Sequence, residues 1–492
     1  MATVVAMGQQ PWTYGQGQVD KDVLFTDIAW SDDSVVVGCY RATPLVSFPF
    51  GASILVLNTS GNLLHERQLA PSLHHAVPTV VLAGSTQGVR VLGSYAEYGD
   101  SLPGFFHYKF TPDNPLPDST FIPINGARFT SLKNAALLED GSVVAAGSAA
   151  FGSANLLNYS QLFRINADGQ VVSNNGFSLP GSILQVTRDI VPFNNGLLAS
   201  FESWPQTPAY YGKITLDLNL TTYWSGQAPH YDPLNPLDSI VKGPMTLRPI
   251  DNSSFVVGGV FKVGSPRYNG AVYVVDTTGV TSAAFIPYSQ FNNDYAALDG
   301  CISPIDSSSF YFLFWENFPL SAENIPFEPT EPDVLHVYKL DNQLNILCDF
   351  VLDGFASNTY YVPIRIKTTP NGGFAIVGTK KDMSDPNSRF VGWAQTFSAA
   401  DCNVGIPESS NPGQTLIFPN PGNAGFTVVL NGSSEPGTRI TLYDMQGHVT
   451  ANAVMNGATG HLVCTSLAPG LYYYRVTGHN GTLRASGKWV KQ

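Results

Sequence analysis

Residues 134–148 read NAALLEDGSVVAAGS, and residues 160–177 read SQLFRINADGQVVSNNGF. Each stretch holds two β-rich runs that flank a polar turn of Asp, Asn or Gly. These turn residues suit short hairpin loops, because they tolerate the backbone angles that tight turns require. Together the two stretches therefore predict four short antiparallel strands.

The first half of this unit recurs about every 50 residues, a spacing typical of repeat architectures. The copies are FTDIAWSDDSVVVGCY (25–40), RDIVPFNNGLLASF (188–201), TLRPIDNSSFVVGGV (246–260), CISPIDSSSFYFLFW (301–315) and IRIKTTPNGGFAIVGT (364–379). With residues 79–121 as a degenerate copy, seven units lie between residues 25 and 397. Such units bury both faces only when they stack in a ring, so we predict an all-β fold with a seven-bladed β-propeller. A row of β-sandwiches is the alternative, although this period is short for sandwiches.

The last unit lacks an obvious fourth strand after FVGWAQTFS (390–398). We expect a segment before residue 25 to supply it, either PWTY (11–14) or Val23–Leu24. Such a closure joins the two ends of the ring and leaves no open sheet edge.

The composition excludes several classes of protein. The chain has 492 residues, 25 Lys+Arg and 37 Asp+Glu, so 13% of it is charged and its net charge is −12. Its apolar content excludes disorder, and its acidity argues against nucleic-acid binding. No apolar run approaches the ~18 residues of a membrane span. Low charge with 46 Gly and 35 Pro predicts an extracytoplasmic β protein.

The N-terminus and the cysteines also bear on the compartment. Residues 1–8 (MATVVAMG) have the small-x-small ending of a signal-peptide remnant. The five cysteines are Cys39, Cys301, Cys348, Cys402 and Cys464. They show no CxxC pair and no zinc-ligand spacing, so we predict no metal site and no disulfide framework. If one bridge forms, it joins Cys348 to Cys402; the alternative is that all five are buried and unpaired.

The composition changes at VGIPESSNPGQ (404–414), which we interpret as a linker over 404–413 between a propeller at 9–403 and a domain at 414–492. That last segment contains IFPNP (417–421), GFTVVL (425–430), ITLYDMQGHV (440–449), LAPGLYYYRV (467–476) and GKWVKQ (487–492). In this order the elements closely resemble the type A C-terminal sorting domain of the Bacteroidetes type IX secretion system, a small Ig-like β-sandwich. His448 stands where Arg is commonest. The resemblance implies a sorting signal at Pro419, Asn420, Pro421, Tyr443, Asp444, Gly447, Pro469, Gly470, Tyr472 and Lys488.

The same resemblance implies a route and partners. The chain would pass through the periplasm and meet an outer-membrane translocon and a sortase-like peptidase. It would end as a secreted or outer-membrane surface protein. Residues 414–492 hold five basic and two acidic residues, a net charge of +3 that leaves −15 for the rest. A small basic domain behind a large acidic one suits a recognition tag. Separately, residues 140–177 resemble the delta-60-type propeller repeats of secreted bacterial proteins, which supports the fold but implies no activity.

Two sets of residues are candidates for ligand binding. The first is polar and aligns on the innermost strands, where a propeller has its central channel; it comprises Asp27, Asn134, Arg188 or Asp189, Arg248 and Arg365. The second is aromatic and falls in the long second-to-third-strand loops predicted at 41–51, 94–104, 202–212 and 315–333. Its members are Phe48, Phe50, Tyr95, Tyr98, Trp204, Tyr210, Tyr211, Trp315, Phe318 and Phe327. The alternatives are water-filled lining for the first set and packing of loops onto blades for the second.

A search for catalytic motifs is negative, and we predict no cofactor. Weak candidates are His65–Glu66, His74–His75, Asp113 with Asp118 and Asp232 with Asp238, which solvated turns explain as well. We therefore favour a non-enzymatic protein that binds or adheres to a glycan or protein. The alternative is a secreted polysaccharide-degrading enzyme, a hydrolase or lyase, with its active site at the channel mouth. A structural surface-layer protein is a third possibility.

Overall fold

The computed structural model describes residues 11–17, 21–31, 34–42, 49–69, 76–84, 88–95, 102–110, 118–151, 157–177, 184–204, 209–226, 240–262, 268–278, 281–285, 287, 294–297, 299–317, 329, 331–399, 416–418, 422–430, 437–444, 448–478 and 483–491. The chain divides into two compact units, Met1–Asn403 and Val404–Gln492. In the described residues the single helix is α1 (Gly354–Ser357), and no helix there is long and apolar enough to cross a membrane.

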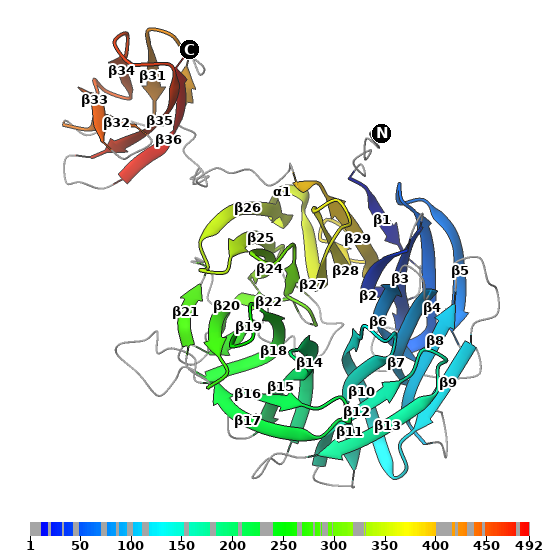
Figure 1. Cartoon of the computed structure of the whole chain (residues 1–492). Helices are drawn as coiled ribbons and strands as arrows, with labels where there is room; N and C mark the ends of the chain where they lie inside the picture. Colours follow the sequence, from blue (N-terminus) through cyan, green and yellow to red (C-terminus); the bar gives the residue numbers. More distant parts are fainter. Residues whose placement is uncertain are drawn as a thin grey trace, which may run out of the picture. The chain divides into compact units, whose positions relative to one another are not determined.

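The first unit is a β-propeller, a ring of small antiparallel sheets around an axis (Figure 1). Within the described residues its strands form six sheets, one of which joins two four-stranded groups through a single parallel pair, Asn158 opposite Leu184. Counting those two groups separately gives the seven sets numbered here as blades one to seven. Blade one is β2 (Asp22–Ser31), β3 (Ser34–Ala42), β4 (Pro49–Asn58) and β5 (Leu63–Leu69). Blade two is β6 (Val77–Gly84), β7 (Gly88–Tyr95), β8 (Gly104–Phe110) and β9 (Asp118–Pro123). Blade three is β10 (Ala127–Leu137), β11 (Val143–Phe151), β12 (Leu157–Ile165) and β13 (Val171–Phe177).

The remaining blades repeat this order. Blade four is β14 (Leu184–Phe193), β15 (Gly196–Trp204), β16 (Ala209–Ile214) and β17 (Leu220–Gly226). Blade five is β18 (Ile240–Pro249), β19 (Ser254–Lys262), β20 (Tyr268–Asp276) and β21 (Thr281–Phe285). Blade six has a split inner strand, β22 (Asp294–Ala296) and β23 (Ile302–Pro304), then β24 (Ser309–Glu316), β25 (Val334–Asp341) and β26 (Ile346–Asp353). Blade seven is β27 (Thr359–Thr368), β28 (Phe374–Asp382), β29 (Val391–Phe397) and β1 (Thr13–Gln16).

Burial within a blade explains the shortage of charge. The inner strand β2 is buried at its first eight positions, and all of β24 is buried. Outer strands such as β5 and β13 instead alternate between exposed and half-buried side chains. Strands covered on both faces require largely apolar sequence, which keeps the charged fraction of the chain low.

The ring closes through the N-terminal segment, which confirms the first of the two predicted closures. β1 pairs antiparallel with β29, with Thr13 opposite Gln395. Val23 and Leu24 belong instead to the inner strand β2. Blades one and seven also meet directly, because the Phe390 N–H donates to Asp22 Oδ1 at 3.1 Å. The Thr379 hydroxyl donates to the Val23 carbonyl at 3.0 Å. No edge of β29 is therefore left unpaired along this register.

Irregularities in the inner strands position the polar residues of the axis. The register of β2 shifts between Phe25 and Asp27, and that of β10 shifts between Leu132 and Asn134. Equivalent shifts precede Asp189 in β14 and Arg365 in β27. A bulge of this kind bends the strand and re-aims the side chain beside it. The same local device therefore recurs at four of the predicted axial residues.

The second unit is a small β-sandwich, as predicted. One sheet contains β30 (Leu416–Phe418), β31 (Gly425–Val429) and β34 (Thr459–Val463). The other contains β33 (Val449–Val454), β32 (Arg439–Tyr443), β35 (Gly470–Thr477) and β36 (Leu483–Lys491). Phe426 from the first sheet packs on Trp489 of the second with ring centroids 5.0 Å apart. These two rings sit in the core that holds the sheets together.

The cysteines are mostly buried thiols. Cys39, Cys301 and Cys464 are free and buried. Cys348 takes part in a disulfide, so the prediction that all five are unpaired is wrong. Its predicted partner Cys402 lies outside the described residues.

Candidate functional site

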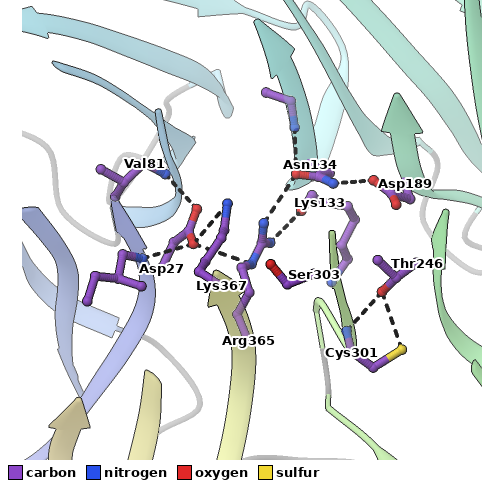
Figure 2. A network of polar contacts seen from close by, with 12 residues as sticks. Asp27, Val81, Lys133, Asn134, Asp189, Thr246, Cys301, Ser303, Arg365 and Lys367 are labelled. Atoms are coloured by element: carbon purple, nitrogen blue, oxygen red, sulfur yellow. Dashed lines mark hydrogen bonds and ion pairs between the residues drawn. The ribbon is translucent and has the colours of Figure 1, made fainter. Parts of the chain in front are cut away.

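Polar side chains from several inner strands meet at the propeller axis. Figure 2 shows Asp27 of β2, Asn134 of β10, Asp189 of β14 and Arg365 of β27 in one continuous network. Asp27, Asp189 and Arg365 are each at most 3% exposed. The inner strands of four blades thus bring together four of the residues predicted to line the channel.

Arg365 reaches across the axis. Its Nη1 donates to Asn134 Oδ1 at 3.2 Å, and its Nη2 lies 3.4 Å from the Lys133 carbonyl. Its Nε lies 3.7 Å from Asp27 Oδ1 and has no hydrogen-bond partner among the described residues. A Cβ on Gly300 would come within 2.7 Å of Arg365 Cγ, so the glycine leaves room for the Arg365 side chain to pack against the backbone there. One guanidinium therefore links blades one, three and seven.

The Asp27 carboxylate joins neighbouring blades. Its Oδ1 accepts from the Ile28 N–H at 2.9 Å, and its Oδ2 accepts from the Val81 N–H of blade two at 2.9 Å. Lys367 Nζ adds a third partner, 3.5 Å from Oδ1. Both oxygens are thus occupied by groups that hold the ring together.

Asp189 has the same role between blades four and five. Its Oδ1 accepts from the Ile190 N–H at 2.7 Å and from the Asn134 side-chain amide. Its Oδ2 accepts from the Leu247 N–H at 2.6 Å. Burial raises the pKa of Asp189, while these hydrogen bonds act in the opposite direction. The carboxyl group is a structural connector, because three donors already use its acceptor sites.

Two lysines at the axis have fewer partners. Lys367 Nζ has Asp27 Oδ1 at 3.5 Å, and Lys133 Nζ has Asp299 Oδ1 at 3.9 Å. Both separations exceed the ~2.7–3.2 Å of a good N–H···O hydrogen bond. Burial lowers the pKa of both ammonium groups, because water no longer solvates the charge fully. These donors are the least satisfied charged groups in the network.

A cavity of about 490 Å³ lies against this network. Its polar lining includes Asn134, Asp189, Asp299, Ser303, Arg365 and Lys367. Its apolar lining includes Ala135, Ile190, Leu247, Ile302 and Ile366, with prolines at the ends of the inner strands, Pro192, Pro249 and Pro304. Apolar walls with a few placed polar groups are typical of small-molecule sites.

The lining comes from the C-terminal halves of inner strands, next to the tight turns that lead into the second strands. β15 and β24 are second strands, so they end at the other face of the propeller. The predicted long connections begin there. The cavity and the predicted aromatic loops therefore belong to opposite faces.

Arg248 forms part of the cavity wall. Its Nη1 donates to Asn342 Oδ1 at 2.8 Å, and its Nη2 donates to the Asp306 carbonyl at 2.8 Å. Its guanidinium carbon lies 5.1 Å from the centroid of the Phe310 ring. Arg248 thus attaches blade five to the turns of blade six, and its charged group is already engaged.

The predicted aromatic shelf needs correction where the structure describes it. Trp315 is fully buried, and its Nε1 donates to Asp333 Oδ2 at 2.5 Å. Tyr95 is 6% exposed and packs edge-on against Phe121, and Tyr211 is 2% exposed. These residues belong to the strands β7, β16 and β24 rather than to loops, so they contribute to the blades' packing and not to an exposed surface.

Other predicted aromatic positions are not described at side-chain level. Tyr98, Phe48, Phe318 and Phe327 lie outside the described residues. Phe50, Trp204 and Tyr210 lie in β4, β15 and β16, but their side chains are outside the description. Their roles stay predictions.

The weaker candidates do not form a catalytic group in the described residues. His65 and Glu66 lie in strand β5 rather than in a turn. Glu66 accepts from Arg41 Nη2 at 2.5 Å and from Gln16 Nε2 at 3.1 Å, which ties β5 to β1 and β3. Nor do the described residues contain three His, Cys, Asp or Glu side chains placed to hold a metal. The pair His74–His75 and Asp113, Asp232 and Asp238 are outside the described residues, and only the backbone of Asp118 is described, in β9.

The positions implied for the sorting signal lie at strand ends and in the core of the second unit. Tyr443 ends β32, Gly470 begins β35 after Pro469, and Lys488 is in β36. Tyr472 is 8% exposed and its hydroxyl donates to the Ala468 carbonyl at 2.9 Å. Asp444 accepts from the His448 N–H at 2.9 Å, so His448 closes the turn there. Pro419, Asn420, Pro421 and Gly447 lie outside the described residues.

Three solved structures show how far the likeness to known proteins extends. A DUF4221 family member from Bacteroides vulgatus is 10% identical, with 80% of this chain and 98% of that chain covered at a TM-score of 0.37. NanB sialidase from Streptococcus pneumoniae is 7% identical, with 75% and 84% covered at 0.42. The GH93 α-L-arabinofuranosidase of Fusarium graminearum is 13% identical, with 68% and 95% covered at 0.39. Similarities this distant carry no argument about activity.

The sequence comparisons are informative for the second unit. No curated protein matches this chain. The resemblance of residues 140–177 to delta-60-type repeats stays a prediction. Residues 416–492 match the model of the "Secretion system C-terminal sorting domain" family, as the sequence motifs predicted. On that match the chain is a β-propeller protein that carries a type IX sorting domain and is exported to the cell surface or beyond.

Proposed function

We propose that this exported propeller is a non-enzymatic binding protein that holds the end of a saccharide in its axial cavity. The supporting observation is the cavity of about 490 Å³, with apolar walls and a floor formed by the Arg365 network. Sugar rings present apolar C–H faces together with hydroxyl groups, so they match a cavity with apolar walls and a polar floor. Export to the cell surface or beyond brings the protein to extracellular glycans.

The size of the cavity favours a small ligand over a protein partner. Ligand sites typically enclose ~300–1,000 Å³, whereas a stable protein interface buries ~800 Å² on each partner. A cavity of this size takes a sugar or two rather than a folded surface. Protein adhesion is therefore not assigned to this site.

The state of the carboxylates favours binding over hydrolysis. A glycosidase needs two carboxyl groups that are free to exchange protons or attack the sugar. Three carboxylates line the cavity, and two of them, Asp189 and Asp306, already accept backbone N–H groups. Asp299 is then left without the second free carboxyl group that hydrolysis requires. This supports a role in binding for the axial site.

A blocking variant tests the proposal. Ser307 lines the cavity from an exposed turn, so Ser307→Trp places an indole over its mouth. Asn252 occupies the same position in the equivalent turn of blade five but does not line the cavity, so Asn252→Trp is the matched control. We expect a glycan array to show saccharides that bind the full chain and the control but not Ser307→Trp. Equal binding by both variants, or no saccharide bound at all, would refute the proposal.

A further inference from the structure

We infer that the sugar group that reaches the floor of this cavity is anionic, a carboxylate or a sulfate ester, and that Lys367 Nζ binds it beside Arg365. This inference rests on the proposed function and specifies its ligand. It follows from a comparison of the hydrogen-bond donors and acceptors on the cavity lining, because some of the donors lack a close acceptor.

The floor of the cavity carries hydrogen-bond donors that lack a close acceptor. Lys367 lines the cavity, and about 30% of its side chain is exposed. Within the described part of the chain its ion-pair partner is Asp27, at 3.5 Å. Arg365 Nε has no hydrogen-bond partner in the same part of the chain, although Arg365 is only 3% exposed. Arg365 Nε is closed to a ligand, whereas an incoming oxygen atom would be stabilised at Lys367, whose ion-pair partner lies beyond hydrogen-bond distance.

Two of the three carboxylates on the lining already accept hydrogen bonds, and the third has a counter-charge beyond hydrogen-bond distance. The three carboxylates that line the cavity are Asp189, Asp299 and Asp306. Asp189 accepts from three donors, as described above. Asp306 Oδ1 accepts from the Ser308 and Ser309 N–H groups at 2.7 and 2.8 Å within its own turn. Asp299 has the Lys133 ammonium 3.9 Å away as its counter-charge.

Lys367 shares its own counter-charge. The Asp27 carboxylate also faces Arg365 Nε at 3.7 Å and accepts two backbone N–H groups. The Asp27 carboxylate thus lies near two cations, and burial lowers the pKa of Lys367 although Asp27 and Asp189 act in the opposite direction. An anionic ligand oxygen accepts from Nζ at hydrogen-bond distance, which the Asp27 carboxylate does not, and brings a negative charge into contact with the ammonium group. A neutral hydroxyl supplies one acceptor and no charge.

The test uses matched sugars on the full chain. Methyl glucuronoside and methyl galacturonoside are compared by titration calorimetry with their carboxyl-reduced forms, methyl glucoside and methyl galactoside. Galactose 6-sulfate forms a third arm that separates sulfate from carboxylate. We expect an acidic sugar to bind at least ~10-fold more tightly than its neutral match, because charge-assisted hydrogen bonds are the stronger ones.

Variants assign the preference to the lysine. Lys367→Met should remove the preference for the acidic sugar, and Lys367→Arg should retain it. Lys339→Met is the control, since Lys339 lies in β25 and does not line the cavity. Circular dichroism of each variant shows whether it is folded.

The outcomes separate the two proposals. If neutral sugars bind as tightly as acidic ones and Ser307→Trp blocks both, the axial saccharide site stands and its anionic ligand is refuted. If the acidic preference survives in folded Lys367→Met, the assignment to Lys367 is refuted. If Ser307→Trp changes no binding, or no saccharide binds the wild-type chain, the proposed function itself fails.

Discussion

Arg365 Nη1 donates to Asn134 Oδ1 across 3.2 Å, so a side chain of blade seven hydrogen-bonds to blade three across the propeller axis. Most contacts between blades in this protein join neighbours, as when the Asp189 carboxylate accepts from the Leu247 N–H. The Arg365 link instead spans the ring and lies on the floor of the cavity. Stability of the ring and shape of the site are therefore coupled through one residue.

Replacing this arginine should destabilise the propeller. Arg365→Met removes the donor to Asn134 and one of the two cations beside the buried Asp27 carboxylate. Losing one partner of a buried ion pair costs about 3–5 kcal/mol, and Lys367 compensates in part, so we expect about 3 kcal/mol. Denaturant unfolding followed by circular dichroism measures the loss. An unfolding midpoint equal to that of the wild-type chain would contradict a stabilising role.

Trp315 offers a test of core packing against surface binding. The indole N–H donates to Asp333 Oδ2 at 2.5 Å, and the Tyr361 N–H donates to Asp333 Oδ1 at 2.8 Å. Trp315→Phe leaves a buried acceptor unpaired and should cost about 1–3 kcal/mol. Because Trp315 is fully buried, saccharide affinity should not change. A folded Trp315→Phe variant with unchanged stability but weakened binding would restore the aromatic-shelf hypothesis.

Closure of the ring by β1 predicts different effects for two truncations. Deletion of residues 1–17 removes β1 and Trp12, whose N–H donates to Thr396 Oγ1 at 2.9 Å. The exposed edge of β29 then becomes a template for strand addition, so we expect a lower melting temperature and aggregation. Deletion of residues 1–10 keeps β1 and should leave both properties unchanged. Light scattering during thermal unfolding distinguishes the two truncated proteins, and identical curves would argue against closure by β1.

The polar residues of the axis were predictable because their strands repeat a local pattern. Asp27 and Asp189 each stand before an apolar residue in an inner strand, and both occupy the position after a bulge. Lys367 was missed, although it lies two residues from Arg365 and period-2 alternation places both on one face. The hydrogen bond from Arg365 to Asn134 could not be predicted from the sequence, because no local pattern relates blade seven to blade three.

The aromatic prediction is wrong for Tyr95, Tyr211 and Trp315, which are buried in strands. Turn residues locate a tight hairpin well, but nothing in SFYFLFWE marks where β24 stops, and the strand continues to Glu316. Trp315 was therefore counted as a loop residue although it packs inside blade six. The predicted loop at 94–104 likewise begins within β7, so it includes Tyr95, the last residue of that strand. Motifs identified the sorting domain more securely because its turns and strands occur in a fixed order.

His336 predicts how stability changes with pH. Its Nδ1 lies 3.1 Å from Asp349 Oδ1, its Nε2 lies 3.6 Å from Glu316 Oε1, and its ring stacks on Tyr338. Burial alone would lower the pKa of His336, but Asp349, Glu316 and Asp294 raise it above the ordinary 6.5. A histidine with a raised folded-state pKa contributes stability that is complete below pH 6.5 and is lost as pH rises through the folded pKa.

The wild-type chain should therefore lose stability relative to His336→Gln, which cannot titrate, as the pH rises above 6.5. The comparison uses denaturant unfolding at several pH values and reads the difference between the two proteins, so that titration of other groups cancels. Asp349→Asn should reduce the pH effect, because the nearest carboxylate provides the largest part of the attraction for the imidazolium. If wild type and His336→Gln show the same pH dependence, the imidazolium makes no net contribution, and burial offsets the three carboxylates.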